Sequence, residues 1–228
     1  MDDLQHNYKI VRFGNEEEPI VIIDDFSGQL DELMEKAANC HYEPALGGYP
    51  GHRAPADVNY LAGRGKLLTE IFYQVFGFDR GGHTESCTFS MVTTQRTALS
   101  VHQCMPHFDD TGPDLLALLH YLKGPETGGT SFYRQRRTGF ETVTPDRLTE
   151  YKTALTTDMK THGAPAQDYI CGSDKRYELI GTVDARPDRM IIYRGRTLHS
   201  GAIPPGFPIS PDPRHARLSL NTFLTRLH

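Results

Sequence analysis

Two residues with metal-binding side chains, His107 and Asp109, stand two positions apart in the segment CMPHFDDT at residues 104–111. In an extended segment, residues i and i+2 project to the same side, so both side chains could reach one ion. An imidazole and a carboxylate together suit a borderline divalent metal such as Fe(II). A chain with 11 histidines often produces such a pair by chance. The pair therefore predicts a metal site only together with further ligands.

Further candidates stand in the last third of the chain. His199 follows an apolar run in the segment MIIYRGRTLHSGAI, at a point where a turn would expose it. Arg217 and Ser219 are again two positions apart and would share one face of a strand. A planar guanidinium binds a carboxylate through two hydrogen bonds, and a neighbouring hydroxyl can complete such a site. The sequence thus offers one more metal ligand and one anion site.

The segments that must position these residues are mostly short strands. Short strands separated by turns rich in glycine and proline are typical of a sandwich or barrel. Strands are predicted at residues 8–13, 19–26, 87–93, 115–122, 130–134, 176–183, 189–194 and 218–225. Helices are predicted at residues 28–38 with Ser27 as N-cap, at 67–76, and at 145–162 with Thr144 as N-cap and Pro145 at the first helical position. Residues 42–55 are expected to form a long loop.

The order of these motifs is more specific than any one of them. An HxD pair, a hairpin with a GG turn, a distal histidine and an RxS follow one another in PHFDD, LLHYLKGPETGGTSFY, PDRMIIYRGRTLHSG and RLSLNTFL. In this the chain resembles the Fe(II)- and 2-oxoglutarate-dependent dioxygenase superfamily, in particular its prolyl-hydroxylase-like branch. The resemblance covers residues 87–225, and the first 85 residues carry no diagnostic motif.

The resemblance implies a mainly β fold with α cover, a double-stranded β-helix of the jelly-roll, cupin-like kind. It implies a single domain over residues 1–228, with a cover of helices and strands at 1–84 and a β-helix core at 85–228. Iron would be held by His107, Asp109 and His199. The co-substrate 2-oxoglutarate would pair with Arg217, helped by Ser219, with Tyr121 as a secondary candidate, and O2 would be the oxidant. Related halogenases have a small residue at the position of Asp109, so this carboxylate favours hydroxylation, desaturation or ring formation.

Two departures from the family pattern concern the cavity. The segment between His199 and Arg217 is longer than is common in the family, and its residues 202–216 include five prolines, which predicts a stiff loop at the barrel mouth. This leaves Arg214 as a lesser alternative to Arg217. The helical patch lies in an insert at about residues 144–170, between the two halves of the metal site. Such inserts often shape a substrate pocket.

Other chemically active residues receive plainer interpretations. His102, five residues before His107, would point to the opposite face of a regular strand and is expected to be structural or solvated. His120 cannot share a face with Tyr121 and is expected to be packed against other elements. Asp110 is interpreted as a solvated neighbour of the metal ligand, and Cys104 as a small buried hydrophobic residue.

The arginine clusters at 134–137 and 194–196 are expected to lie on solvated faces with acidic partners, among 29 Asp and Glu in the chain. A sharper hypothesis places one of them in the cavity as a ligand for a substrate carboxylate. Arg134 is the best candidate for that role because it follows the GGTSFY strand.

Composition excludes several classes of protein. The chain has 228 residues, 38% of them hydrophobic, and a net charge of −5. It is thus neither disordered nor a membrane protein, and binding to nucleic acid is not expected because phosphate contacts draw on clustered Lys and Arg. Four scattered cysteines form no zinc framework. The first 13 residues do not resemble a secretory signal, so a cytoplasmic location is expected. Oligomeric state stays open.

Three functions fit these observations. The leading hypothesis is an oxygenase that oxidises an unactivated C–H bond of a small molecule, such as an amino acid or a biosynthetic intermediate, and releases succinate and CO2. The second is a peptidyl or protein hydroxylase, which would need an open groove. The third is a metal-binding, cupin-like sensing or interaction domain without 2-oxoglutarate turnover, for which Arg217 would have to be an ordinary surface residue. The substrate and the regiochemistry stay open.

Overall fold

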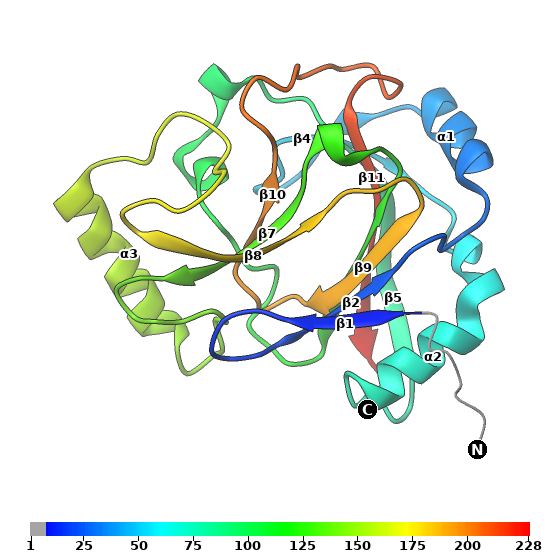
Figure 1. Ribbon diagram of the computed structural model, residues 1–228, viewed down its shortest axis with the longest axis horizontal. Coiled ribbons are helices and arrows are strands. Elements are labelled where there is room, and N and C mark those ends of the chain that lie inside the picture. The colour runs from blue at the N-terminus through cyan, green and yellow to red at the C-terminus, as the bar shows by residue number, and fades with distance from the viewer. Residues whose placement is uncertain (1–7) are drawn as a thin grey trace.

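The computed structural model describes residues 8–228, and the start of the chain, where no secretory signal was expected, lies largely outside that range. Two antiparallel sheets form the body of the molecule (Figure 1). In spatial order the large sheet contains β1 (Lys9–Arg12), β2 (Pro19–Ile23), β9 (Arg189–Arg194), β6 (Leu115–Tyr121), β11 (Arg217–Arg226), β5 (Gly82–Val92), β4 (Gly51–Pro55) and β3 (Glu43–Pro44). The small sheet contains β10 (His199–Ala202), β7 (Gly129–Gln135) and β8 (Tyr177–Asp184).

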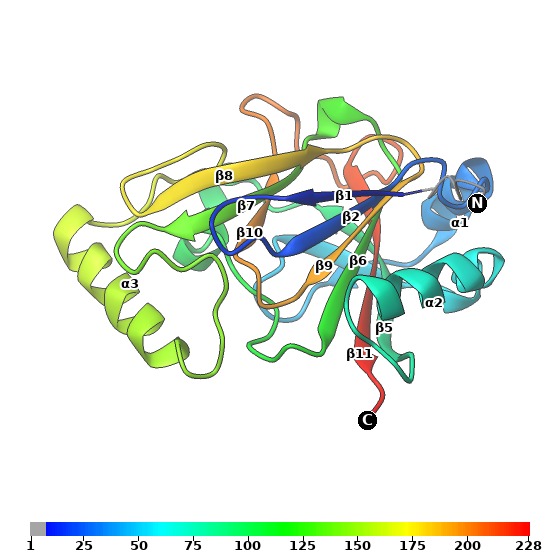
Figure 2. The ribbon, with the colours of Figure 1, turned by 60° about the horizontal axis from the view of Figure 1, so that its bottom comes forward.

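The two sheets face each other across an apolar core. Alternation along β6 sends Ala117, Leu119 and Tyr121 into this core, where they pack with Phe132 of β7 and Val183 of β8. Figure 2 shows β7 and β8 as a layer over the strands of the large sheet. This two-sheet arrangement confirms the predicted mainly β, double-stranded β-helix fold.

The opposite face of the large sheet is covered by the N-terminal helices. The outward residues of β6, Leu116 and Leu118, pack with Ile71 and Phe72 of α2 (Gly65–Gln74). Helix α1 (Leu30–Asn39) and the 3-10 helix η1 (Val58–Arg64) lie over the same face, and Leu33 of α1 packs near β5 and β11. Figure 1 shows α1 and α2 on the same side of the molecule. Burying these amphipathic stripes provides the main driving force for this layer.

The N-terminal segment also contributes strands, two of which the sequence analysis missed. β3 and β4 fall within residues 42–55, which were predicted as a loop, and extend the large sheet at the edge beyond β5. The predicted N-caps were wrong as well. α1 begins at Leu30 and has no side-chain cap, because the Ser27 hydroxyl bonds Asp188.

The predicted helix in the insert is present as α3 (Leu148–His162), three residues later than expected because Thr144 bonds Asp146 instead of capping it. Its Tyr151 packs with Tyr133 of β7 and Tyr177 of β8, on the side of the small sheet away from α1 and α2 (Figure 1). The helix therefore stabilises the small sheet. Within residues 8–228, no helix is long and apolar enough to cross a bilayer.

Candidate metal and co-substrate site

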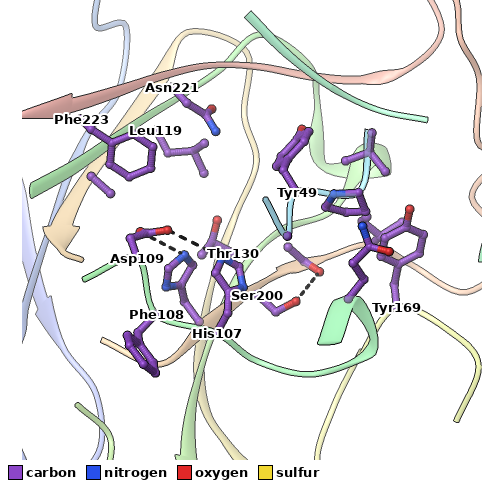
Figure 3. A pocket seen from close by; sticks show the side chains of 18 of the residues that line it. Tyr49, His107, Phe108, Asp109, Leu119, Thr130, Tyr169, Ser200, Asn221 and Phe223 are labelled. Atoms are coloured by element: carbon purple, nitrogen blue, oxygen red, sulfur yellow. Dashed lines mark hydrogen bonds and ion pairs between the residues drawn. The ribbon is translucent and has the colours of Figure 1, made fainter. Parts of the chain in front are cut away.

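Three of the predicted residues meet at one end of the space between the sheets. One ligand atom from each of His107, Asp109 and His199 lies within 4.8 Å of the others. Nε2 of His107 is 3.8 Å from Oδ1 of Asp109, and Nε2 of His199 is 3.6 Å from Oδ2. These separations are too long for hydrogen bonds. In Figure 3 the Asp109 carboxylate points toward the imidazoles. The set has the composition of a 2-His-1-carboxylate site.

His107 and Asp109 lie in extended backbone outside the regular strands, contrary to the prediction. His199 is the first residue of β10 and is buried, whereas a turn was expected to expose it. His107 and His199 form an isolated bridge in which each amide donates to the other's carbonyl at 2.8 Å. The Asp109 amide donates to the Gly195 carbonyl at 2.7 Å. A Cβ at Gly195 would lie 2.9 Å from the side chain of Leu115 and 3.4 Å from the Cβ of Asp109, so glycine leaves room for both neighbours. The predicted same-side projection of His107 and Asp109 holds because the segment is extended.

The protonation of the histidines fits metal ligation. His199 holds its Nδ1 2.9 Å from the Thr197 carbonyl, which places the proton on Nδ1 and leaves the Nε2 lone pair facing Asp109. Burial lowers the pKa of His199 to about 4. Desolvation by the surrounding protein, followed by the charge of His199, lowers the pKa of His107 to about 4 against the opposing charge of Asp109, although 56% of the His107 side chain is exposed. Both imidazoles are therefore neutral at pH 7, as a metal requires.

Arg217 lies at the start of β11 and is only 5% exposed. Its Nη2 donates to the Gly129 carbonyl at 2.8 Å, while its Nε is buried without a hydrogen-bond partner. Within the described part of the chain, no carboxylate forms an ion pair with it. A buried charge without a counter-ion is costly, so this guanidinium is arranged to receive an anion.

Three hydroxyl-bearing residues lie on β11, β6 and β7 near this end of the cavity, and of Ser219, Tyr121 and Thr130 only Thr130 lines it. Ser219 projects from the same face of β11 and donates to the Asn221 side chain at 2.8 Å. The Tyr121 hydroxyl is 2.6 Å from that of Thr130, and burial raises the pKa of Tyr121 to about 12 while the Arg217 charge opposes the increase. Sequence analysis missed Thr130, although it directly follows the GG turn that brings β7 close to β10.

A cavity of about 500 Å³ connects the metal-binding residues with Arg217. Figure 3 shows His107, Asp109 and Thr130 on one side and Tyr49 and Tyr169 on the other. One group of lining residues that was not predicted comes from the segment before and within β4: Leu46, Gly48, Tyr49, Pro50 and Arg53. Tyr169 is the only residue of the insert that lines the cavity, and Ile203 is the only residue of the proline-rich loop that does so.

Two of the candidate arginines lie elsewhere. Arg134 does not line the cavity, because its guanidinium bonds Glu141 at 2.8 Å and Glu178 at 2.9 Å. This arrangement contradicts its predicted role as a substrate ligand and matches the plainer interpretation of the cluster. Arg214 is exposed in a turn, with its amide bonded to Asp212. Of the three arginines proposed from the sequence, Arg217 is therefore the one that lines the cavity together with the metal-binding residues.

The predictions for His102, His120 and Cys104 had different outcomes. His102 lines the cavity rim instead of pointing away from it, because residues 101–104 form a 3-10 helix, η3 (Val101–Cys104), and not a strand. His120 is packed, as predicted, with Nε2 2.8 Å from Asp188 under the helical cover. Cys104 is buried in an apolar cluster, as predicted.

Comparisons with known structures agree with this architecture. The chain is similar to the non-heme α-ketoglutarate-dependent epimerase SnoN from nogalamycin biosynthesis, with a TM-score of 0.55 and 14% identity over 92% of this chain and 79% of that one. It is also similar to HygX from Streptomyces hygroscopicus, solved with nickel and 2-oxoglutarate, with a TM-score of 0.52 and 12% identity over 92% and 84%. These likenesses establish that the chain shares the fold of 2-oxoglutarate-dependent oxygenases.

Sequence comparisons give a family but no curated relative. No curated protein matches the chain. A family model matches residues 4–224, which is nearly the whole sequence. The chain therefore belongs to the DUF6445 family, which is described as a family of unknown function.

Proposed function

We propose that this protein is an Fe(II)- and 2-oxoglutarate-dependent oxygenase that oxidises an unactivated C–H bond of a small molecule, with release of succinate and CO2. The observation that carries the proposal is the buried guanidinium of Arg217, which lacks a carboxylate partner in the described part of the chain and faces the same cavity as His107, Asp109 and His199. A metal site beside a buried cation suits a dianion that chelates the metal at one end and pairs with the cation at the other.

The residues present fit iron. Two neutral imidazoles and one carboxylate, with ligand atoms within 4.8 Å of one another, suit a borderline divalent ion, which His107, Asp109 and His199 would hold. The Thr197 carbonyl fixes the orientation of the His199 ring, as carbonyl groups commonly do behind metal ligands. When bound, iron would supply the activation of O2 by coupling it to decarboxylation of the co-substrate.

The protein's own groups would orient 2-oxoglutarate. Arg217 would bind the carboxylate remote from the metal through its unpaired Nε and the N–H groups that do not bond the Gly129 carbonyl, with the hydroxyl of Thr130 beside it in the cavity lining and those of Tyr121 and Ser219 behind. This end of the cavity lies against the inner core, where Arg217, Tyr121 and Tyr193 are all buried. In such an environment each hydrogen bond to the anion is stronger than in water.

The cavity favours a small molecule over a peptide. Its volume of about 500 Å³ lies in the range of small-ligand sites. Tyr49, Tyr169 and Ile203 wall it from three separate segments, which narrows the groove that an extended peptide would need. A cupin-like domain without 2-oxoglutarate is not favoured, because it predicts an exposed Arg217, whereas this residue is 5% exposed.

The test measures succinate release from the iron-loaded protein with 2-oxoglutarate and O2. Parallel panels contain free carboxylic acids, amino acids and short peptides. We expect stimulation by members of the small-molecule panels, and loss of all turnover in His107→Ala. Stimulation by peptides alone would replace the small-molecule proposal with the peptidyl hydroxylase, and full turnover in His107→Ala would refute the site.

A further inference from the structure

A second arginine faces the cavity without a carboxylate partner. Arg53 lies on β4, and its guanidinium carbon is 4.5 Å from the centre of the Tyr49 ring. Its Nε is buried without a hydrogen-bond partner. No described acidic side chain forms an ion pair with it, in contrast to Arg134, Arg189 and Arg196. Tyr49 stabilises the cation through its ring but leaves the N–H donors available.

Arg53 acts on the metal-binding end of the cavity. Its positive charge reaches both His107 and Asp109 electrostatically. The Tyr49 hydroxyl is buried without a hydrogen-bond partner. Burial raises the pKa of Tyr49, and the positive charges of Arg217 and Arg53 oppose this increase. Tyr49 is thus within reach of two guanidinium groups in one cavity.

The charges of the loaded site do not balance without a further anion. Among the described residues that line the cavity, Arg53 and Arg217 are cationic and Asp109 is the one carboxylate. With histidines counted as neutral, a divalent ion gives a formal charge of three positive units. The 2-oxoglutarate dianion reduces this to one. Because unbalanced charge is costly in a site of low dielectric, the substrate is expected to contribute one negative charge.

The other walls specify the remainder of that substrate. Phe108, Leu119, Tyr169 and Phe223 give the cavity an apolar and aromatic lining. Besides Asp109, no carboxylate in the described lining could receive an ammonium group. A zwitterionic amino acid would therefore leave its ammonium without an ionic partner, whereas an apolar chain would be well accommodated.

We infer that Arg53 is the receptor for the carboxylate of the substrate, and that the substrate is a monocarboxylic acid with an apolar body and no free ammonium. This inference rests on the proposed function, because the charge count assumes bound iron and 2-oxoglutarate. It replaces Arg134 with Arg53 as the residue that selects an anionic substrate.

Anaerobic calorimetry on protein saturated with Fe(II) and 2-oxoglutarate tests the inference, because Arg217 is then occupied. The probes are 3-phenylpropanoate and hexanoate, each with its neutral amide, and L-phenylalanine as the zwitterion. We expect each acid to bind at least about tenfold more tightly than its amide or the amino acid. No preference for acid over amide in the wild-type protein would overturn the inference, whether both bind or neither does.

Variants separate Arg53 from the co-substrate site. Arg53→Gln should abolish the preference for acids while keeping 2-oxoglutarate affinity within about threefold, and Arg53→Lys should restore part of the preference. Arg214→Gln removes the same charge from an exposed position and should behave as wild type. A loss of 2-oxoglutarate affinity in Arg53→Gln as large as in Arg217→Ala would assign Arg53 to the co-substrate and overturn the inference. If the wild-type protein binds no 2-oxoglutarate, the proposed function fails, and the acid–amide comparison then tests Arg53 in the Arg217→Ala variant, where no second arginine of the described lining can bind the acid.

Discussion

A histidine–aspartate group lies on each side of the large sheet, and the two groups differ in hydrogen bonding. On the outer face, His120 Nε2 is 2.8 Å from Asp188 Oδ1. On the inner face, the corresponding distances from Asp109 to His107 and His199 are 3.8 and 3.6 Å. The outer distance is a hydrogen bond, and the inner ones leave room for an ion between the groups.

In the outer pair Asp188 is fully hydrogen-bonded, and the buried Nδ1 of His120 is the one polar side-chain atom of the pair without a hydrogen-bond partner. Asp188 also accepts from the amide and hydroxyl of Ser27, at 3.0 and 2.6 Å, and from the Gly28 amide at 2.8 Å. The His120 ring stacks on Tyr60 at 5.8 Å. This group ties the segment before α1 to β6, so its chemistry is used for stability. The inner group has the same residue types, but the Nε2 atoms of its histidines form no hydrogen bond with the Asp109 carboxylate. Polar groups left without partners in this way are typical of a binding site.

The largest expected effect concerns the inner group. His107→Ala removes one of three ligands and should weaken Fe(II) binding by more than about 100-fold, as measured by anaerobic metal titration. The free energy of unfolding of the metal-free protein should change by less than about 1 kcal/mol, because the ring makes no hydrogen bond within residues 8–228.

His83→Ala is a matched control for this substitution. His83 is exposed near the start of β5, a strand that reaches the cavity only at its last residue, Val92. Metal affinity equal to that of wild type is expected. Equal losses in the two variants would show that the inner group is no special site.

Arg217→Ala should weaken 2-oxoglutarate binding by about 2–5 kcal/mol, since the anion then loses its buried cationic partner. Iron should bind as before, because Arg217 supplies no metal ligand. Calorimetry with each ligand in turn makes the measurement, and Arg214→Gln provides the control. Loss of iron together with 2-oxoglutarate would mean that Arg217 supports the fold and not the co-substrate.

Asp188→Asn should produce the opposite pattern. The substitution replaces a buried carboxylate that takes part in four hydrogen bonds with a neutral amide, which accepts fewer and weaker ones. The free energy of unfolding should therefore fall by about 2–4 kcal/mol in a denaturant titration. Asparagine tolerates the positive φ of 59° at this position, which keeps the backbone comparable. Metal affinity of the folded protein should not change. A stable variant that has lost iron binding would reverse the assignment of the two faces.

The outer pair also predicts an acid dependence. Burial opposes ionisation of Asp188, but hydrogen bonds from His120, Ser27 and Gly28 outweigh it and hold the pKa well below its ordinary value. A lowered pKa in the folded state contributes stability that is fully present above the unfolded pKa of about 3.9 and is lost as pH falls below it. The difference in stability between wild type and Asp188→Asn should be constant from pH 5 to 7 and narrow below about pH 4. A difference that widens on acidification would contradict this account.

The smallest effect is expected at Arg134. Its ion pairs with Glu141 and Glu178 are already made, so Arg134→Gln should cost about 1–2 kcal/mol of stability. Binding of 2-oxoglutarate and of carboxylic acids should not change in calorimetry. A lost preference for acids would restore the original hypothesis for Arg134.

The sequence predicted what depends on local pattern and motif order. The apolar run of β6 and the hydrophobic stripe of α2 identified elements of the large sheet and its cover. The order of HxD, GG turn, distal histidine and RxS was sufficient to propose His107, Asp109, His199 and Arg217, and the structure brings all four to one cavity.

The rest depends on contacts between distant segments. Arg53 reaches the cavity because β4 pairs with β5, where Arg53 stands opposite Ser90, and no local signal predicts that pairing. Whether an arginine has an ion-pair partner depends on acidic residues that are distant in the sequence. Arg134, for example, pairs with Glu178. Ser27 has the sequence position of an N-cap, but its hydroxyl donates a hydrogen bond to Asp188, which is remote along the chain. Such competition is set by tertiary structure.

Anaerobic titration of the wild-type protein with Fe(II) and then 2-oxoglutarate tests the central claim most directly. Chelation of iron by the co-substrate gives a visible charge-transfer band in the superfamily that the chain resembles. We predict a band that saturates with both ligands, disappears in His107→Ala and requires far more 2-oxoglutarate in Arg217→Ala. A well-folded wild-type protein that shows no band would contradict the assignment of the inner face as an iron and 2-oxoglutarate site.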